Sequence, residues 1–196
     1  MRRHLIGGAL IVSLGLGITA AARADDVTDQ LNEALRAYEK KDLATASAAL
    51  DVAQTLIRQM SADVWKTMLP EPLAGWNADE AESTSVGAAM LGGGTSVSRN
   101  YRKDSDNVEI TLVTDSPLLQ GMGALFSGGM VTGSDMKLLV IDGRKTTFTK
   151  SENSYQTMVS NKALVKVTGS KGVDDATLRA YLTAIKFQQI EKAAQQ

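Results

Sequence analysis

The chain has 196 residues, with 21 basic and 22 acidic side chains, one histidine and no cysteine. The absence of cysteine excludes disulfides, thiolate catalysis and lipid attachment at an N-terminal cysteine. The only histidine, His4, lies in a segment that we expect to be removed, so the mature chain would lack the Ser-His-Asp triad, the Cys-His dyad and ordinary zinc sites.

Residues 1–24 are typical of an export signal. Arg2 and Arg3 precede an apolar run from Leu5 to Ala22, and Ala22-Arg23-Ala24 has the small-x-small pattern of a cleavage site. We therefore predict a periplasmic protein with no integral membrane segment after signal cleavage. Cleavage would remove three basic and no acidic residues, leaving 18 against 22 and a net charge of −4. This balance disfavours nucleic acid as a partner.

Helical periodicity follows over residues 25–68. Val27, Leu31, Leu35 and Tyr38 fall on one stripe, and Asp42 is a candidate N-cap for a second helix. The second helix is predicted to carry on its inner face Leu43, Ala46, Leu50, Ala53, Leu56, Ile57, Met60, Val64 and Met68. The small residues among them allow the two helices to approach closely. We therefore predict an antiparallel helical hairpin.

The hairpin sequence resembles a single tetratricopeptide-type helix pair. The resemblance is carried by Ala37-Tyr38, Asp42-Leu43, Ala46, Leu50, Ala53 and Leu56, and it departs from the pattern by a missing glycine and a shortened turn. Such repeats need roughly three copies to bury their faces, so one copy cannot form a peptide-binding superhelix. We expect the hairpin to pack on its own domain or on a twin subunit.

A proline-containing segment, Leu69-Pro70-Glu71-Pro72-Leu73-Ala74-Gly75-Trp76, separates the hairpin from a sequence of different character. Proline removes a backbone donor and keeps the preceding residue out of the α region, so the helix must end near Met68 and the chain must continue extended. We expect Trp76 to be substantially buried where the hairpin meets the next domain.

Residues 69–188 are predicted to form an antiparallel β-sheet flanked by helices, which gives the chain an α+β fold. Strands are expected at Thr95–Tyr101 and Val108–Leu112, and two further hairpins at 137–150, around Asp142-Gly143, and at 155–168. Asp174 or Asp175 is expected to cap a last amphipathic helix. Residues 189–196 are predicted to be a frayed tail.

An uncharged helix is predicted over residues 116–130, beginning at Ser116-Pro117. It is too short to span a bilayer, and three interpretations stay open: a helix buried against the sheet, a lid over an apolar pocket, or a surface for a partner or a lipid. The candidate contact residues for a partner or ligand are Leu118, Leu119, Met122, Leu125, Phe126 and Trp76.

The order of these elements over about residues 69–187 resembles the PsbP-like group, and the Leu-Pro-x-Pro-Leu-x-Gly-Trp entry is similar to that of a set of exported bacterial proteins of unknown function. The resemblance concerns element order and transfers no catalytic motif. It implies a non-enzymatic accessory or binding role in the cell envelope.

Three functional hypotheses follow from the sequence. The first is a non-enzymatic periplasmic accessory or binding protein that contacts an envelope protein or a second copy of itself. The second is a carrier with an apolar pocket for a small ligand or lipid under the helix at 116–130. The third is a minor hydrolase without His or Cys. We assign no catalytic residue, cofactor or metal ligand.

Three short motifs bear on the hydrolase hypothesis. Ser134-Asp135-Met136-Lys137, Ser151-Glu152-Asn153 and Lys166-Val167-Thr168-Gly169 follow the order of the motifs of penicillin-recognising enzymes. The first precedes a predicted strand, whereas that family needs a helix start, and the chain is far shorter than those folds.

Overall fold

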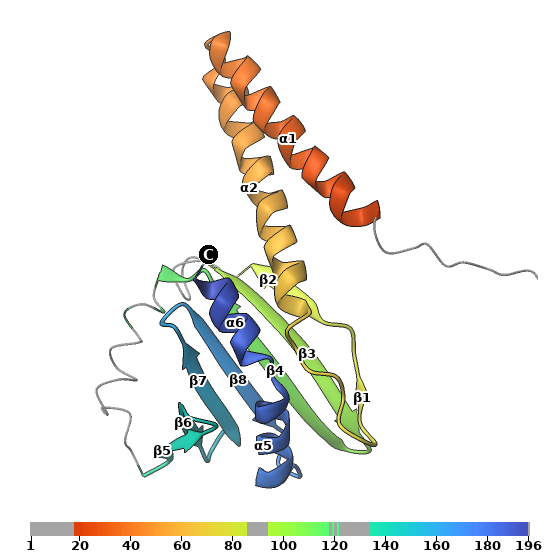
Figure 1. The fold of residues 1–196 in the computed structure, drawn as a ribbon, viewed down its shortest axis with the longest axis vertical. Helices are drawn as coiled ribbons and strands as arrows, with labels where there is room; N and C mark the ends of the chain where they lie inside the picture. Colours follow the sequence, from red (N-terminus) through yellow and green to blue (C-terminus); the bar gives the residue numbers. More distant parts are fainter. Residues whose placement is uncertain (1–17, 86–93, 118, 120, 122–133, 196) are drawn as a thin grey trace, which may run out of the picture. The chain divides into compact units, whose positions relative to one another are not determined.

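The computed structural model describes residues 18–85, 94–117, 119, 121 and 134–195 (Figure 1). Contacts divide the chain into two compact units, Met1–Met60 and Ser61–Gln196, and each is described here by itself. The described residues form helices in both units and one antiparallel sheet in the second unit. The predicted α+β class, with an N-terminal helix pair, is therefore confirmed.

Two helices, α1 (Ile18–Glu39) and α2 (Leu43–Lys66), form the predicted hairpin. At the turn, Lys41 has a φ of 63°, its amide donates to the Tyr38 carbonyl at 2.9 Å, and the Asp42 amide donates to the Ala37 carbonyl at 2.9 Å. These two bonds close a Schellman motif in which Lys41 takes the left-handed position usually held by glycine. Asp42 caps α2 as predicted, because its Oδ1 accepts from the Thr45 amide at 3.1 Å.

The predicted inner face of α2 is confirmed for Ala46, Ala53 and Met68, which are buried, and wrong for Leu43, Leu50, Ile57 and Val64, which are between 48% and 64% exposed. Leu56 and Met60 are half-buried. Among the described side chains of the first unit, those that are buried are alanines: Ala34, Ala37, Ala46, Ala49 and Ala53. Alanine side chains let two helix backbones approach closely, and the larger residues beside the seam are then left outside it.

Eight strands among the described residues form one sheet in the order β1-β3-β4-β8-β7-β6-β5, with β2 also paired to β3, and all pairs are antiparallel. The strands are β1 (Asn77–Ala78), β2 (Glu82–Ser85), β3 (Thr95–Lys103), β4 (Asp106–Thr114), β5 (Met136–Ile141), β6 (Arg144–Thr149), β7 (Ser154–Val159) and β8 (Ala163–Gly169). The predicted strands are confirmed, including the turn at Asp142-Gly143, where both φ angles are positive, 48° and 75°. Strands β1 and β2 were not predicted.

One face of this sheet is covered by α5 (Asp175–Ala184) and α6 (Phe187–Ala194) (Figure 1). Asp174 is the N-cap of α5, and Leu178, Tyr181 and Leu182 are buried, as predicted. The predicted frayed tail is wrong, because residues 187–194 form α6 with Phe187, Ile190 and Ala194 buried. Their spacing of three and four residues is helical, which is the signal that the sequence analysis missed.

The core of the second unit also includes the chain that leads into the sheet. Trp65, Met68 and Leu69 are between 3% and 7% exposed and belong to the same apolar cluster as the sheet residues. Helix α2 ends at Lys66, and Pro70 follows in extended chain, so the predicted helix end was two residues late.

Candidate functional site

The contact candidates that the structure describes, Leu119 and Trp76, do not form an exposed surface. Leu119 is fully buried. Trp76 is half-buried, less than expected, and its ring meets Tyr181 edge-on with the centroids 5.5 Å apart. Leu118, Met122, Leu125 and Phe126 lie outside the described residues, as does most of the predicted helix at 116–130.

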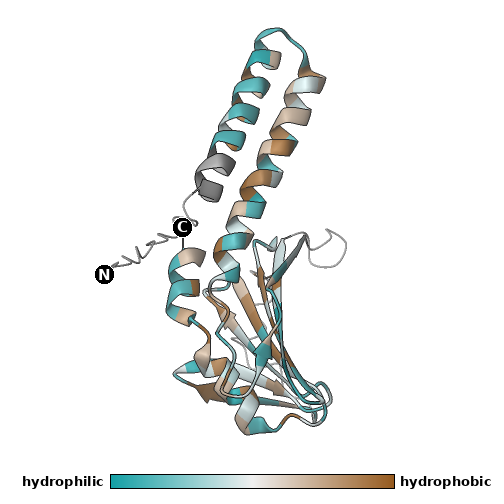
Figure 2. Cartoon of the chain, turned by 90° about the vertical axis from the view of Figure 1, so that its right-hand side faces the viewer, coloured by the Kyte–Doolittle hydropathy of each residue, from teal (hydrophilic) through white to brown (hydrophobic). Residues whose placement is uncertain are grey.

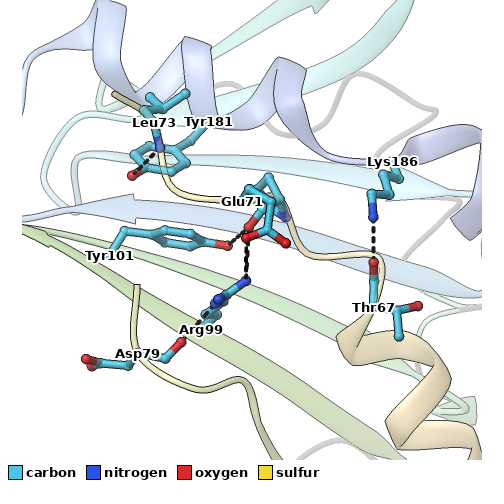
Figure 3. A network of polar contacts seen from close by, with 9 residues as sticks. Thr67, Glu71, Leu73, Asp79, Arg99, Tyr101, Tyr181 and Lys186 are labelled. Carbon is cyan, nitrogen blue, oxygen red and sulfur yellow. Dashed lines mark hydrogen bonds and ion pairs between the residues drawn. The ribbon is translucent and has the colours of Figure 1, made fainter. Parts of the chain in front are cut away.

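The segment that carries Trp76 is held to the sheet by a polar network (Figure 3). The Tyr101 hydroxyl donates to the Pro70 carbonyl oxygen at 2.7 Å, and Arg99 Nη1 donates to the same oxygen at 3.3 Å. The Leu73 amide donates to the Tyr181 hydroxyl at 3.4 Å. Burial raises the pKa of Tyr101 and of Tyr181 above the ordinary value for tyrosine. Both hydroxyls therefore stay neutral and hold extended chain in place.

The structure places the three motifs of the hydrolase hypothesis near one another, but not in the arrangement that catalysis needs. Ser134 lies in a turn before β5, where the penicillin-recognising enzymes need a helix start. The Ser151 hydroxyl donates to Asp135, and Lys166 Nζ lies 2.7 Å from Glu152 Oε2. The hydrogen bond from Lys166 is the main cause that lowers the pKa of Glu152. Neither serine is therefore paired with a lysine that could act as its base.

A second polar cluster joins β7 to α5. The Tyr155 hydroxyl donates to Asp175, and Arg179 Nε lies 2.7 Å from the other carboxylate oxygen. Burial raises the pKa of Tyr155 to about 12. Burial alone would raise the pKa of Asp175, but the hydrogen bonds from Tyr155 and Arg179 outweigh it and lower that pKa. At pH 7 the tyrosine is neutral and the carboxylate is charged. The contact therefore has a structural role, because neither group has a pKa near 7 as a general acid or base would need.

Within the described ranges, no group of three or more acidic or histidine side chains could hold a metal ion. No helix in this part of the chain is long and apolar enough to cross a membrane. An open cavity of about 390 Å³ is lined by Trp65, Thr114, Asp115, Ser116, Pro117, Lys162, Ala193 and Ala194. Its lining mixes charged and apolar residues, and it borders the start of the segment at 116–130.

An exposed apolar surface lies on the hairpin. We call this surface the leucine face, and it consists of six side chains: Leu31, Leu35, Tyr38, Leu43, Leu50 and Ile57. These side chains are between 46% and 65% exposed. Figure 2 shows apolar (brown) positions recurring along α2 of the hairpin. Large apolar side chains are therefore left exposed together, while alanines are buried beside them, which makes this surface the candidate site for an interaction.

Helix geometry places these six residues on one side of the hairpin. With 3.6 residues per turn, the residues of the leucine face lie about a quarter-turn from the alanine seam, and in the same rotational sense in both helices. Val52 of α2, which is 47% exposed, lies on the opposite side of the seam. Because α1 and α2 run in opposite directions, rotation in the same sense brings both sets to the same side of the seam. The predicted inner face of α2 contained residues of both the alanine seam and the leucine face, because the two are adjacent on the helix surface.

Comparison with known protein families, with curated proteins and with solved structures finds no match to this chain. Its function is therefore inferred from its own residues.

A more specific sequence signal for the leucine face was available. Leu43, Leu50, Ile57 and Val64 recur at intervals of seven residues, whereas Ala46, Ala49 and Ala53 follow a spacing of three and four. Separating residues by size as well as by periodicity distinguishes a seam of small residues from a second, outward stripe.

Proposed function

We propose that this protein is a non-enzymatic accessory or binding protein of the bacterial cell envelope that acts through protein contacts made by its helical hairpin. The observation that carries the proposal is the leucine face. Six large apolar side chains of the hairpin are about half exposed or more, while the helix seam is formed by alanines. Such an arrangement leaves apolar surface that a binding partner would remove from water.

The surroundings support a binding role. Ser151, Lys166 and Tyr101, which could serve the hydrolase hypothesis, make the structural contacts described above. The signal-like residues 1–24 support a periplasmic location, and the resemblance of the second unit to the PsbP-like group supports an accessory role.

Site-specific photo-crosslinking in cells tests this proposal. A photoreactive phenylalanine replaces Leu50, on the leucine face, or Ala48, an exposed alanine on another side of α2. We expect discrete protein adducts from position 50 and none from position 48. The mature chain is detected after release of the periplasm, so the same experiment checks its location.

Two results would overturn the proposal. If position 50 gives no protein adduct, or if positions 48 and 50 give the same set of adducts, the leucine face has no specific protein partner. An adduct with lipid alone at position 50 would reassign the face to a membrane surface.

A second candidate function, a carrier of a small ligand or lipid, is supported by the cavity beside Ser116 and Pro117. Its volume of about 390 Å³ falls at the lower end of the range for ligand pockets. Native mass spectrometry of protein purified from cells would show a retained ligand if this function holds. A ligand-free protein that lipids do not stabilise against heat would count against it.

A further inference from the structure

We infer that the leucine face is covered by the leucine face of a second copy of this chain, so that two hairpins form a four-helix bundle. This inference rests on the proposed function, since it identifies the protein partner of the same surface. It is carried by the spacing of the apolar residues and by the absence of charge on the face, and the area of the face sets the expected strength of the dimer.

The spacing indicates a helical partner. Leu43, Leu50 and Ile57 recur at intervals of seven residues along α2, and Val64 continues the interval toward the end of that helix. A repeat of seven keeps an apolar stripe in contact with a neighbouring helix over several turns, as in coiled coils and helical bundles. A flat surface or an extended peptide would not require this interval.

The charge pattern favours a second copy. In a two-fold symmetric interface the same surface is present on both partners, so a surface with charges of one sign would meet charges of the same sign. Residues 25–60 carry seven acidic and four basic side chains. Helix geometry places those within the helices away from the leucine face, whose remaining positions on α2 are Ser47 and Gln54. The face is therefore electrostatically compatible with itself.

The same charges disfavour a membrane surface. Interfacial helices are usually rich in lysine and arginine, which attract anionic lipids. The hairpin from Asp25 to Met60 has a net charge of −3, from the seven acidic and four basic residues. An anionic bilayer would repel it.

The area fits a weak dimer. The leucine face extends along about 21 Å of α2, from Leu43 to Ile57, and along about 10 Å of α1, from Leu31 to Tyr38, because each residue adds about 1.5 Å. With a width of about 10 Å for each helix, two such faces would together bury on the order of 600 Å². This value lies below the range for stable specific interfaces, so the dimer should form only at high protein concentration.

The test is the oligomeric state of the purified mature chain by analytical ultracentrifugation across a range of concentrations. We expect twice the mass of one chain at high concentration. Leu50→Glu places a carboxylate in the self-facing surface and should raise the dimer Kd by about 100-fold or more. Ala48→Glu, the matched control on another side of α2, should leave the Kd within about threefold.

Circular dichroism distinguishes lost association from lost folding. Leu50 is 51% exposed in the single chain, so Leu50→Glu should retain the helical signal. If it does not, Leu50→Ser takes its place, because it removes the apolar contact without adding a charge. A dimer that neither substitution weakens would overturn the inference.

Failure of this inference is distinguishable from failure of the proposed function. If the protein is monomeric and position 50 crosslinks to a different envelope protein, the inference of a second copy is overturned and the proposed binding role stands. A monomeric protein without any crosslinked protein would overturn both. A crosslink within one chain, from position 50 to the second unit, would identify the protein's own sheet unit as the cover.

Discussion

The two units of this chain bury apolar residues in opposite ways. The sheet unit encloses large side chains such as Tyr101, Ile110 and Leu178, each fully buried. The hairpin encloses alanines and leaves its leucines and Ile57 in contact with solvent. A buried alanine removes little surface from water, whereas a buried leucine contributes about 1.5–3 kcal/mol. The sheet unit therefore buries most of its large apolar side chains by itself, apart from positions such as Leu138 and Val140 of β5, whereas the hairpin leaves most of its own exposed.

Under the proposed function, this difference identifies the unit where a partner would bind. Hydrophobic stabilisation of the sheet unit is realised inside one chain, so changes there affect folding. Most of the apolar surface that the hairpin presents remains available for association, so changes there should affect binding first. Trp65, in the last turn of α2, and Trp76 both lie in the second unit, so their fluorescence reports on that unit.

The largest expected contrast comes from the same substitution made in each unit. Leu178→Ala, at a fully buried position of α5, should lower the free energy of unfolding of the sheet unit by about 2–5 kcal/mol. Leu43→Ala, at a position that is 64% exposed, should change the stability of the dilute protein by less than about 0.5 kcal/mol. Chemical denaturation followed by tryptophan fluorescence and by circular dichroism measures both. Equal losses in dilute protein would show that Leu43 is already covered within one chain.

A smaller effect is expected when the alanine seam is overfilled. Ala53 is 2% exposed between the two helices, so Ala53→Leu should force them apart and destabilise the hairpin by about 1–3 kcal/mol. Ala48→Leu adds the same side chain at an exposed position of the same helix and should be nearly neutral. Thermal unfolding followed by circular dichroism compares the two. If both substitutions are tolerated equally, the helices do not meet at the alanines.

Local signals explain what could be predicted from the sequence. The Asp142-Gly143 turn and the Asp174 cap were predicted because each depends on the chemistry of a few adjacent residues. Strands β1 and β2 were missed because they are short, polar and formed by pairing with β3, a partner distant in sequence. The leucine face was missed because periodicity alone does not distinguish the inner side of a helix from an adjacent outer one. Of the predicted contact residues, four lie outside the described residues, and Leu119 and Trp76 take part in packing.

Removal of a single hydroxyl group should have a still smaller effect, again only in the sheet unit. Tyr101→Phe deletes the donor to the Pro70 carbonyl and should cost about 1 kcal/mol, because Arg99 still donates to that oxygen. Tyr38→Phe, at a side chain that is 65% exposed on the hairpin, should change stability by less than about 0.5 kcal/mol. Urea denaturation of both variants provides the comparison. A cost for Tyr38→Phe as large as that for Tyr101→Phe would contradict the assignment of Tyr101 as an anchor.

The last prediction concerns how the free energy of unfolding of the sheet unit changes at alkaline pH. Burial raises the pKa of Tyr155 from 10.0 to about 12. An unfolded tyrosine loses its proton near pH 10, whereas the folded one keeps it, so ionisation favours the unfolded state there. The contribution of Tyr155 is fully present below pH 10 and is lost as the pH rises toward 12. Tyr155→Phe cannot ionise, so its free energy of unfolding should decline less steeply over this interval. Identical slopes for the two proteins would show that Tyr155 is not held neutral by burial in the folded state.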